Sequence, residues 1–173
     1  MSDNRQLLLA AYDQYADAIY RHCFFRVFNK AKAEELMQET FLKVWVYMEK
    51  GPFGSAQGRE VKNIRAFLYR VANNLIIDYI RRKKEESLDA MTEDENFIEP
   101  AGADQKDLEK EVLLNEVKDQ INDLPEDYKQ ILIMRYVDDL EPREIAEVLD
   151  LDANNVSVKI HRGLMMLKSR FKI

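Results

Sequence analysis

The chain has 173 residues, of which 46% are hydrophobic and 34% are charged, with 5 glycines, 4 prolines and a single cysteine. This composition is typical of a globular protein and excludes collagen-like, wholly disordered and disulfide-stapled proteins. The N-terminal stretch holds only a short apolar patch, and no run of about eighteen apolar residues occurs, so neither a secretory signal nor a membrane span is expected. We therefore expect a cytoplasmic protein without membrane insertion.

The net charge of −6 is unevenly distributed along the chain. Residues 1–84 carry 15 Lys and Arg against 9 Asp and Glu, residues 85–123 carry 3 against 14, and residues 124–173 carry 8 against 9. The three segments therefore have net charges of +6, −11 and −1. A basic part, an acidic connector and a nearly neutral C-terminal part predict two folded units joined by a linker.

Glycine and proline are scarce outside residues 51–102, and apolar residues recur every three or four positions, so we predict an all-α fold. The stretch 50–58 contains three glycines and a proline and is predicted to be a loop. The acidic stretch 87–107 contains Pro100 and Gly102 and is predicted to be a flexible linker. It separates two small helical domains, residues 1–86 and residues 108–173.

The segment 33–48 is predicted to be an amphipathic helix. We assign its broad apolar face to the core: Ala33, Leu36, Met37, Phe41, Val44, Trp45 and Met48. The opposite face mixes polar and aliphatic side chains: Glu35, Gln38, Glu39, Leu42 and Val46. Single exposed aliphatic side chains are common, so an ordinary solvent face is one interpretation. The pair Leu42 and Val46 also fits a docking surface for another helix.

A second long helix is predicted from about residue 63 to residue 84. Its core face would hold Ile64, Phe67, Leu68, Val71, Leu75 and Tyr79. Its other side carries a polar stripe, Arg70, Asn73, Asn74 and Arg81, followed by Arg82, Lys83 and Lys84. Guanidinium and amide groups at this spacing suit the phosphates and base edges of nucleic acid. A run of cations at the end of a helix also complements the helix dipole without any ligand.

The C-terminal domain is predicted to contain a helix-turn-helix. An apolar helix follows Leu124-Pro125 and ends near Tyr136, a second covers 143–149, and a third runs from about Ala153 to Phe171 after a short break. The inner face of the third helix is assigned to Val156, Ile160, Gly163, Leu164, Leu167 and Phe171. Its first turns present Asn154, Asn155, Ser157, Val158, His161 and Arg162 outward. Residues 153–173 hold five Lys and Arg and no acid, which favours DNA binding over a purely packing helix.

No metal, cofactor or catalytic constellation is indicated. His22 and His161 lie far apart in the sequence, and Cys23 has no second cysteine, so a buried structural thiol is the simplest interpretation. A nucleic-acid enzyme could use Glu34, Glu35 and Glu39 as metal ligands, but no His, Asp or Ser constellation accompanies them. We therefore expect a protein without enzymatic activity.

Three motifs resemble the extracytoplasmic-function group of bacterial RNA polymerase sigma factors, in the sigma-70 family. They are Ala33 to Trp45, Phe67 to Arg81, and Leu124 to Leu167, and they occur in the same order as in that group. The resemblance implies a two-domain initiation factor. Its first domain would bind the clamp coiled coil of core RNA polymerase and open the −10 promoter element, and its second would read the −35 element. It also implies an anti-sigma factor as a partner.

The resemblance assigns roles to residues of this chain position by position. Glu35, Gln38, Glu39 and Leu42 resemble the polymerase-docking face, and the loop 51–62 resembles the segment that captures an unstacked base. The −10 contacts would be Arg70, Asn73, Asn74, Arg81 and Arg82. The −35 contacts would be Asn154, Asn155, Ser157, Val158, Lys159, His161 and Arg162.

The chain also departs from the usual pattern of the group. Phe67 stands where tryptophan is usual, Asn155 replaces a usual threonine, and the loop 50–62 is longer than is common. Asp150 replaces the usual turn glycine, which aspartate tolerates because it adopts left-handed backbone angles more readily than most residues. These differences bear on which promoter sequence is recognised.

The alternative function is a stand-alone helix-turn-helix regulator that does not use polymerase, and it would need a dimer or ligand interface.

The charge distribution suggests a further role for the acidic connector 85–123. DNA affinity comes largely from counterion release at a basic surface, and both predicted DNA-reading helices are locally basic. The connector could therefore compete with DNA for these helices while the protein is free. It could equally serve only as a soluble, extended spacer.

Overall fold

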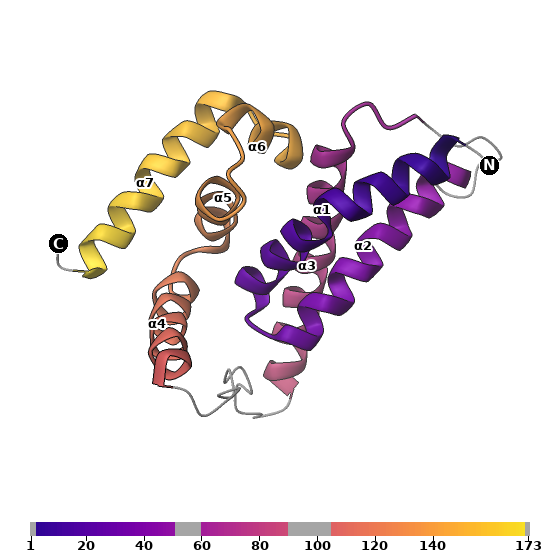
Figure 1. Cartoon of the computed structure of the whole chain (residues 1–173). Helices are drawn as coiled ribbons and strands as arrows, with labels where there is room; N and C mark the ends of the chain where they lie inside the picture. The colour runs from indigo at the N-terminus through magenta and orange to yellow at the C-terminus, as the bar shows by residue number, and fades with distance from the viewer. Residues whose placement is uncertain (1–2, 51–59, 90–104, 172–173) are drawn as a thin grey trace.

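The computed structural model describes residues 3–50, 60–89 and 105–171, and all regular secondary structure in these ranges is α-helical (Figure 1). The helices are α1 (Asp3–Val27), α2 (Lys30–Lys50), α3 (Ile64–Asp89), α4 (Gln105–Asn122), α5 (Glu126–Tyr136), α6 (Pro142–Leu149) and α7 (Ala153–Phe171). The prediction of an all-α fold is confirmed. α3 and α4 extend into the predicted linker from its two sides, and residues 90–104 and 51–59 of the predicted linker and loop lie outside the described residues.

Polar side chains fix where several helices begin. The Oδ1 atom of Asn29 accepts a hydrogen bond from the backbone N–H of Lys32 at 2.8 Å, at the start of α2. At the start of α3, Oδ1 of Asn63 accepts from the backbone N–H of Ala66 at 3.1 Å. At the start of α7, Oδ1 of Asp152 accepts from the backbone N–H of Asn154 at 2.8 Å. Each cap satisfies a backbone donor that the first helical turn leaves free.

The short helix α6 is defined at both ends by local sequence. Pro142 occupies its first turn, and the side chains of Glu141 and Glu144 form a reciprocal capping box. The helix ends at Asp150, whose φ of 54° is left-handed, as the sequence predicted for this turn. The chain can therefore reverse sharply into α7, which gives the predicted helix-turn-helix.

The first unit consists of α1, α2 and α3. The predicted core face of α2 is confirmed, since all of its members are buried except Trp45, which is half-buried. The prediction for α3 is only partly right. Leu68 and Leu75 are buried, but Ile64, Phe67, Val71 and Tyr79 are only partly buried, and Ala66, Tyr69, Ala72, Asn73 and Ile76 are buried in addition. The reason is that α3 packs against α1 and α2 and also against α6 of the second unit.

The second unit consists of α5, α6 and α7, with α4 contacting α7. Its core includes Ile131, Met134, Leu140, Ile145 and Val156. Within the predicted inner face of α7, Val156 and Gly163 are buried and Ile160, Leu164 and Leu167 are partly buried. The assignment of Phe171 to this face is wrong, because Phe171 is 49% exposed. It lies in the last turn of a 19-residue helix, whereas its neighbours α5 and α6 have only 11 and 8 residues.

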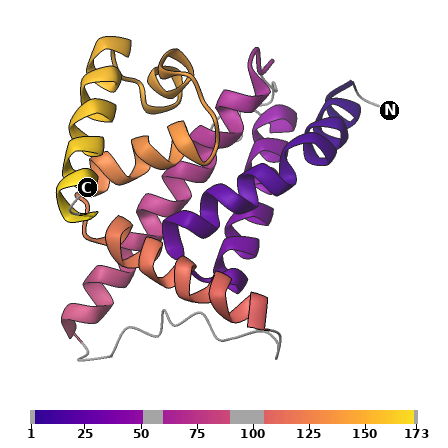
Figure 2. The same cartoon turned by 60° about the vertical axis from the view of Figure 1, so that its left-hand side comes forward.

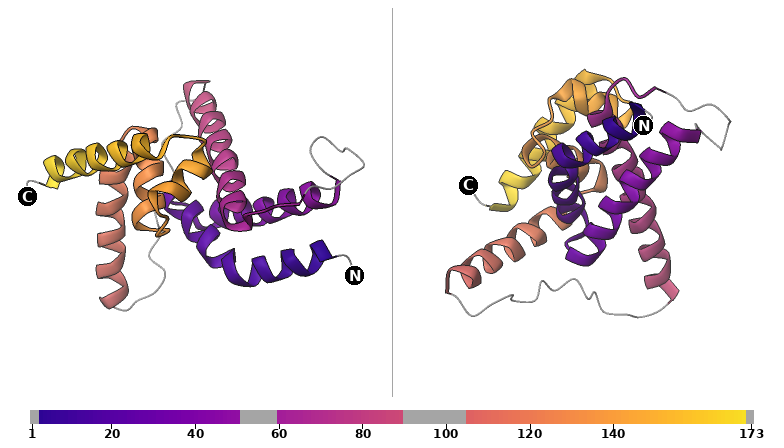
Figure 3. Two further views of the ribbon diagram at one scale, coloured as in Figure 1. Left: turned by 90° about the horizontal axis from the view of Figure 1, so that it is seen from above. Right: turned by 45° about the vertical axis from the view of Figure 1, so that its right-hand side comes forward.

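The two units lie against each other rather than apart. α1 contacts α5 and α3 contacts α6, and the buried side chains of both units form one continuous cluster. Figure 2 shows the α5–α6 side of the second unit facing α1 and α3. In the left view of Figure 3 the start of α1 and the end of α7 lie at opposite ends of the molecule. We call this arrangement the closed arrangement.

Cys23 is fully buried in α1, as expected for a structural thiol. Burial raises the pKa of its thiol to about 12, mainly because the thiolate would lose its hydration. The thiol therefore stays protonated at neutral pH, and protonated thiols are poor nucleophiles.

The packing of α7 on α5 leads to a stability prediction. A Cβ atom placed on Gly163 would lie 3.0 Å from Cδ1 and 3.2 Å from Cγ of Leu132. Gly163→Val should therefore overpack this contact and lower the free energy of unfolding by about 1–3 kcal/mol, measured by urea denaturation. Met165→Val, at an exposed position of the same helix, is the control and should cost about 0.5 kcal/mol. Equal stability of the two variants would contradict the packing described here.

Candidate functional site

The outer face of α2 is a mixed polar and apolar surface. Leu42 is 61% exposed and Val46 is 43% exposed. Around them lie Glu35, paired with Lys32 at 2.9 Å, and Glu39, which is 3.5 Å from Lys43. Gln38 is also exposed. The structure thus places Glu35, Gln38 and Leu42 on an exposed surface, with Glu39 partly exposed beside them. Two aliphatic side chains lie among the charges of this surface.

The polar stripe of α3 is exposed except at one position. Arg70, Asn74, Arg81 and Arg82 are exposed, and Arg81 pairs with Asp78 at 3.0 Å. Asn73 is only 4% exposed. The expectation that Asn73 lies on the outer side of this helix is therefore wrong for the closed arrangement, and the reason is the partner that it finds on α1.

That partner is Arg26, a charged side chain that is completely buried. Its Nη1 donates a hydrogen bond to Oδ1 of Asn73 at 2.6 Å, and its Nη2 donates to Glu126 at the start of α5. Burial lowers the pKa of Arg26 because the cation loses water, and the carboxylate of Glu126 acts in the opposite direction. Arg26 therefore links α1, α3 and the second unit, and Glu126 compensates its charge.

A second buried polar contact joins the units. Nδ1 of His22 lies 2.6 Å from Oδ2 of Asp138, and both side chains are fully buried. The ring of His22 also packs edge-on against Tyr69 of α3, with 5.3 Å between ring centroids. Nε2 of His22 and Oδ1 of Asp138 have no hydrogen-bond partner among the described residues. The two side chains are thus in close contact, but each keeps one polar atom without a hydrogen bond in the described part of the chain.

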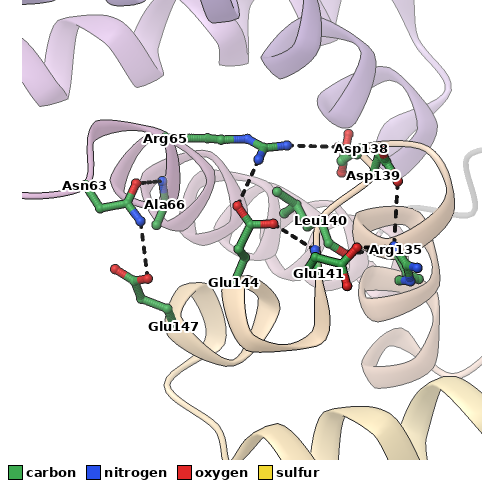
Figure 4. Close-up of polar contacts among 10 residues, drawn as sticks. All are labelled: Asn63, Arg65, Ala66, Arg135, Asp138, Asp139, Leu140, Glu141, Glu144 and Glu147. Carbon is green, nitrogen blue, oxygen red and sulfur yellow. Dashed lines mark hydrogen bonds and ion pairs between the residues drawn. The ribbon is translucent and has the colours of Figure 1, made fainter.

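The start of α3 faces α6 through a row of polar contacts, shown in Figure 4. Nη1 of Arg65 lies 2.8 Å from Oε1 of Glu144, and Nη2 of Arg65 donates to the backbone carbonyl of Asp138 at 3.4 Å. Nδ2 of Asn63 donates to Oε2 of Glu147 at 3.3 Å. Arg70 reaches the backbone carbonyl of Glu147 at 2.5 Å. Three donor side chains of α3 and its cap therefore meet acceptors of α6 and of the turn before it.

The outward face of α7 is as predicted. Asn154, Asn155, Ser157, Val158, His161 and Arg162 are all exposed in the closed arrangement. Lys159 is partly buried and lies 3.3 Å from a carboxylate oxygen of Asp127. Near the end of the helix, Arg170 lies 3.2 Å from the carboxylate of Asp123. The first turns of the second helix of the helix-turn-helix are therefore exposed in the closed arrangement.

The buried polar residues between the units are not among the site residues predicted from the sequence. Their signal was nevertheless present, because Ile19, His22, Cys23 and Arg26 follow the spacing of a single helix face. Two strongly polar residues at core positions of an amphipathic helix require partners, since an unpaired buried charge is very costly. Those partners, Asp138 and Glu126, lie 116 and 100 residues further along the chain, which no local pattern can reveal.

Within residues 3–50, 60–89 and 105–171, no cluster of three or more His, Cys, Asp or Glu side chains could hold a metal ion. In the same ranges no helix is both long and apolar enough to cross a membrane.

Comparison with known proteins identifies the family. Residues 11–86 match the family Sigma-70 region 2, and residues 114–167 match Sigma-70, region 4. The ECF RNA polymerase sigma factor SigW of Bacillus subtilis is 32% identical over 168 residues, which cover 92% of this chain and 86% of SigW. The RNA polymerase sigma factor SigV of the same organism is 27% identical over 95% of this chain and 90% of its own length.

Solved structures share the fold. The sigma factor RpoE of Bartonella quintana, in complex with the anti-sigma factor NepR, matches with a TM-score of 0.71 at 20% identity, covering 100% of this chain and 99% of that one. CnrH, in complex with the cytosolic domain of CnrY, matches with a TM-score of 0.69 at 16% identity, covering 98% and 90%.

The two helical units and their order are those of a promoter-recognising transcription initiation factor. The chain belongs to the sigma-70 family of RNA polymerase sigma factors, in its ECF group. Sigma factors are initiation factors and not enzymes. The alternative of a stand-alone helix-turn-helix regulator is not favoured, because the region 2 match covers most of the first unit, residues 11–86.

Proposed function

We propose a specific division of labour between the two units of this sigma factor. The first, residues 1–86, docks on core RNA polymerase through α2 and recognises and opens the −10 element through α3. The second, residues 108–173, reads the −35 element through the first turns of α7, and residues 87–107 connect the two. The protein then acts in the cytoplasm, where it meets polymerase and promoter DNA.

The observation that carries the docking assignment is the pair of exposed aliphatic side chains on α2. Leu42 and Val46 are among the more exposed large apolar side chains of the first unit, and they lie between carboxylates instead of facing the core. A central apolar contact with a charged rim is the usual composition of a protein interface. Glu35, Gln38 and Glu39 supply the rim on the same face.

Charge and exposure support the DNA assignments. On α3, the exposed cations Arg70, Arg81 and Arg82 can contact phosphates, and Asn74 can reach base edges. Asn73 can join them once its covering contacts are released. On α7, Arg162 and the two asparagines of the first turn, Asn154 and Asn155, stand on the exposed side of a helix that carries no acidic residue. Ser157, Val158, Lys159 and His161 complete this surface.

An anti-sigma factor is the further partner that we propose. Both of the solved structures described above were determined with a bound protein, which for RpoE is an anti-sigma factor. A binding partner of this kind would keep the sigma factor from polymerase until a signal releases it.

The direct test of the docking assignment is co-purification with core RNA polymerase. Leu42→Arg should abolish this binding, because interface hot spots contribute about 2 kcal/mol or more. Its melting temperature should stay nearly unchanged, since the side chain is exposed. Charge reversal at Glu35 or Glu39 should act in the same direction.

The matched control is Leu9→Arg on α1, a leucine of similar exposure outside the α2 face. It should bind polymerase like the wild type. If the wild-type chain itself does not bind core polymerase, the proposed function fails. If Leu42→Arg loses stability and binding in parallel, Leu42 belongs to the core and not to an interface.

A second prediction separates base reading from phosphate attraction on α7. Arg162→Ala should change which −35 sequences are preferred, because a good base-edge contact discriminates by about 1–3 kcal/mol. His161→Ala should act similarly. Lys168→Ala should lower transcription from all −35 sequences by the same factor, as expected for a phosphate contact. The measurement is transcription from a library of −35 sequences with reconstituted holoenzyme. A uniform decrease with Arg162→Ala would argue against its role in base reading.

A further inference from the structure

The contacts between α3 and α6 involve chemical groups that DNA could replace. Arg65 and Asn63 bind the carboxylates of Glu144 and Glu147, and Arg70 binds a backbone carbonyl near the end of α6. All of the acceptors are oxygen atoms, and two of them belong to anions. Guanidinium and amide donors bind DNA phosphate oxygens in the same way. The side chains of α6 therefore occupy donors that a promoter backbone would otherwise engage.

These donors form one surface in the first unit. Asn63 caps α3, Arg65 lies in its first turn, and Arg70 lies between one and two turns further along. Asn63 and Arg65 are the members of this group that lay outside the predicted DNA contacts. The side chain of Arg65 is one-third exposed, so it is neither part of the core nor fully covered. A side chain in this position can exchange one anionic partner for another.

The rest of the interface is built so that it can open. Buried ion pairs often gain little net stability, because the charges lose their hydration when they are buried. Arg26 leaves its Nε without a hydrogen-bond partner among the described residues, and His22 and Asp138 each leave one polar atom in the same condition. Separation of the units would return these atoms to water. The closed arrangement therefore has specific contacts, but the unpaired buried atoms reduce its free-energy advantage over an open arrangement.

We propose that Asn63, Arg65 and Arg70 form a single anion-binding surface with two alternative occupants: the acidic side of α6 in the free protein, and the phosphate backbone of promoter DNA after the units separate. The proposal rests on the proposed function of α3 in the −10 interaction and adds Asn63 and Arg65 to it. The closed arrangement then keeps the free protein from binding DNA. The carboxylates responsible are those of Glu144 and Glu147 on α6 rather than those of the connector 85–123.

The test uses the full-length protein and a fluorescent −10 promoter fragment without polymerase, at low and at high salt. The variant Glu144→Gln with Glu147→Gln removes the competing charges. Glutamine at position 144 can still complete the capping box of α6. We expect tighter DNA binding, by up to about fivefold for each ion pair or charged contact removed, since partly exposed pairs are of this strength. The gain should shrink at high salt.

The matched control is Asp139→Asn with Glu141→Gln, which makes the same change in net charge on the turn before α6. Both of these carboxylates are well exposed and lie 3.6 Å from Arg135 of their own unit (Figure 4). A general electrostatic effect would raise DNA affinity equally in both double variants and would overturn the proposal. A second outcome would also overturn the proposal. In that outcome both double variants bind DNA like the wild type, and affinity rises only after neutralisation of Glu85, Glu86 and the acidic residues 93–99, which would assign the competition to the connector.

The decisive arm compares the two partners of one ion pair. If Arg65 only holds the units together, Arg65→Gln opens the protein and tightens DNA binding, as Glu144→Gln does. If Arg65 also binds DNA, Arg65→Gln should weaken binding in the Glu144→Gln, Glu147→Gln background and should lower the salt slope of that background by about one. Opposite signs for the two partners support the proposal, and equal signs overturn it.

A failure of this inference can be distinguished from a failure of the proposed function. Binding to core polymerase through α2 is measured separately and does not involve Arg65, Glu144 or Glu147. A chain that binds polymerase and promoter as holoenzyme, but whose free variants all bind DNA like the wild type, would retain the proposed function and would refute the inference.

Discussion

The buried guanidinium of Arg26 is the constraint on which the closed arrangement depends. A cation without access to water must be neutralised by a nearby anion or it destabilises the fold. In α1 no neighbouring residue supplies that anion, and Glu126 of α5 does. The same guanidinium holds the amide oxygen of Asn73 on α3. The charge of a single side chain thus ties α1 and α3 of the first unit to α5 of the second.

The other contacts across the interface share this character. His22 and Asp138 form a fully buried polar pair, and Arg65 and Glu144 form a partly exposed ion pair nearby. In each pair the more basic group belongs to the first unit and the carboxylate to the second. This agrees with the charge of +6 on residues 1–84. The second unit is close to neutral overall, but its acidic residues include those of α6 that face α3.

Periodicity and local chemistry predicted α2 with its apolar face, α3 and the helix-turn-helix, because each depends on residues a few positions apart. The left-handed turn at Asp150 and the exposed face of α7 were predictable for the same reason. The burial of Asn73 was not, since it depends on Arg26, 47 residues away. The second covered side of α3 was missed because α6 packs there, and Phe171 was misplaced because helix length, not periodicity, decides whether the last turn finds a partner.

We infer that the free protein is closed and that the surface of α3 proposed to contact the −10 element becomes available only when the units separate. The most direct test is the distance between spin labels on exposed positions of the two units, Asp17→Cys on α1 and Arg143→Cys on α6, measured by double electron–electron resonance. Cys23 is buried and its thiol has a raised pKa, so it can remain in place. A short, narrow distance distribution in the free protein that becomes long in the complex with core polymerase and promoter DNA is predicted. The same distribution in both states would contradict the claim.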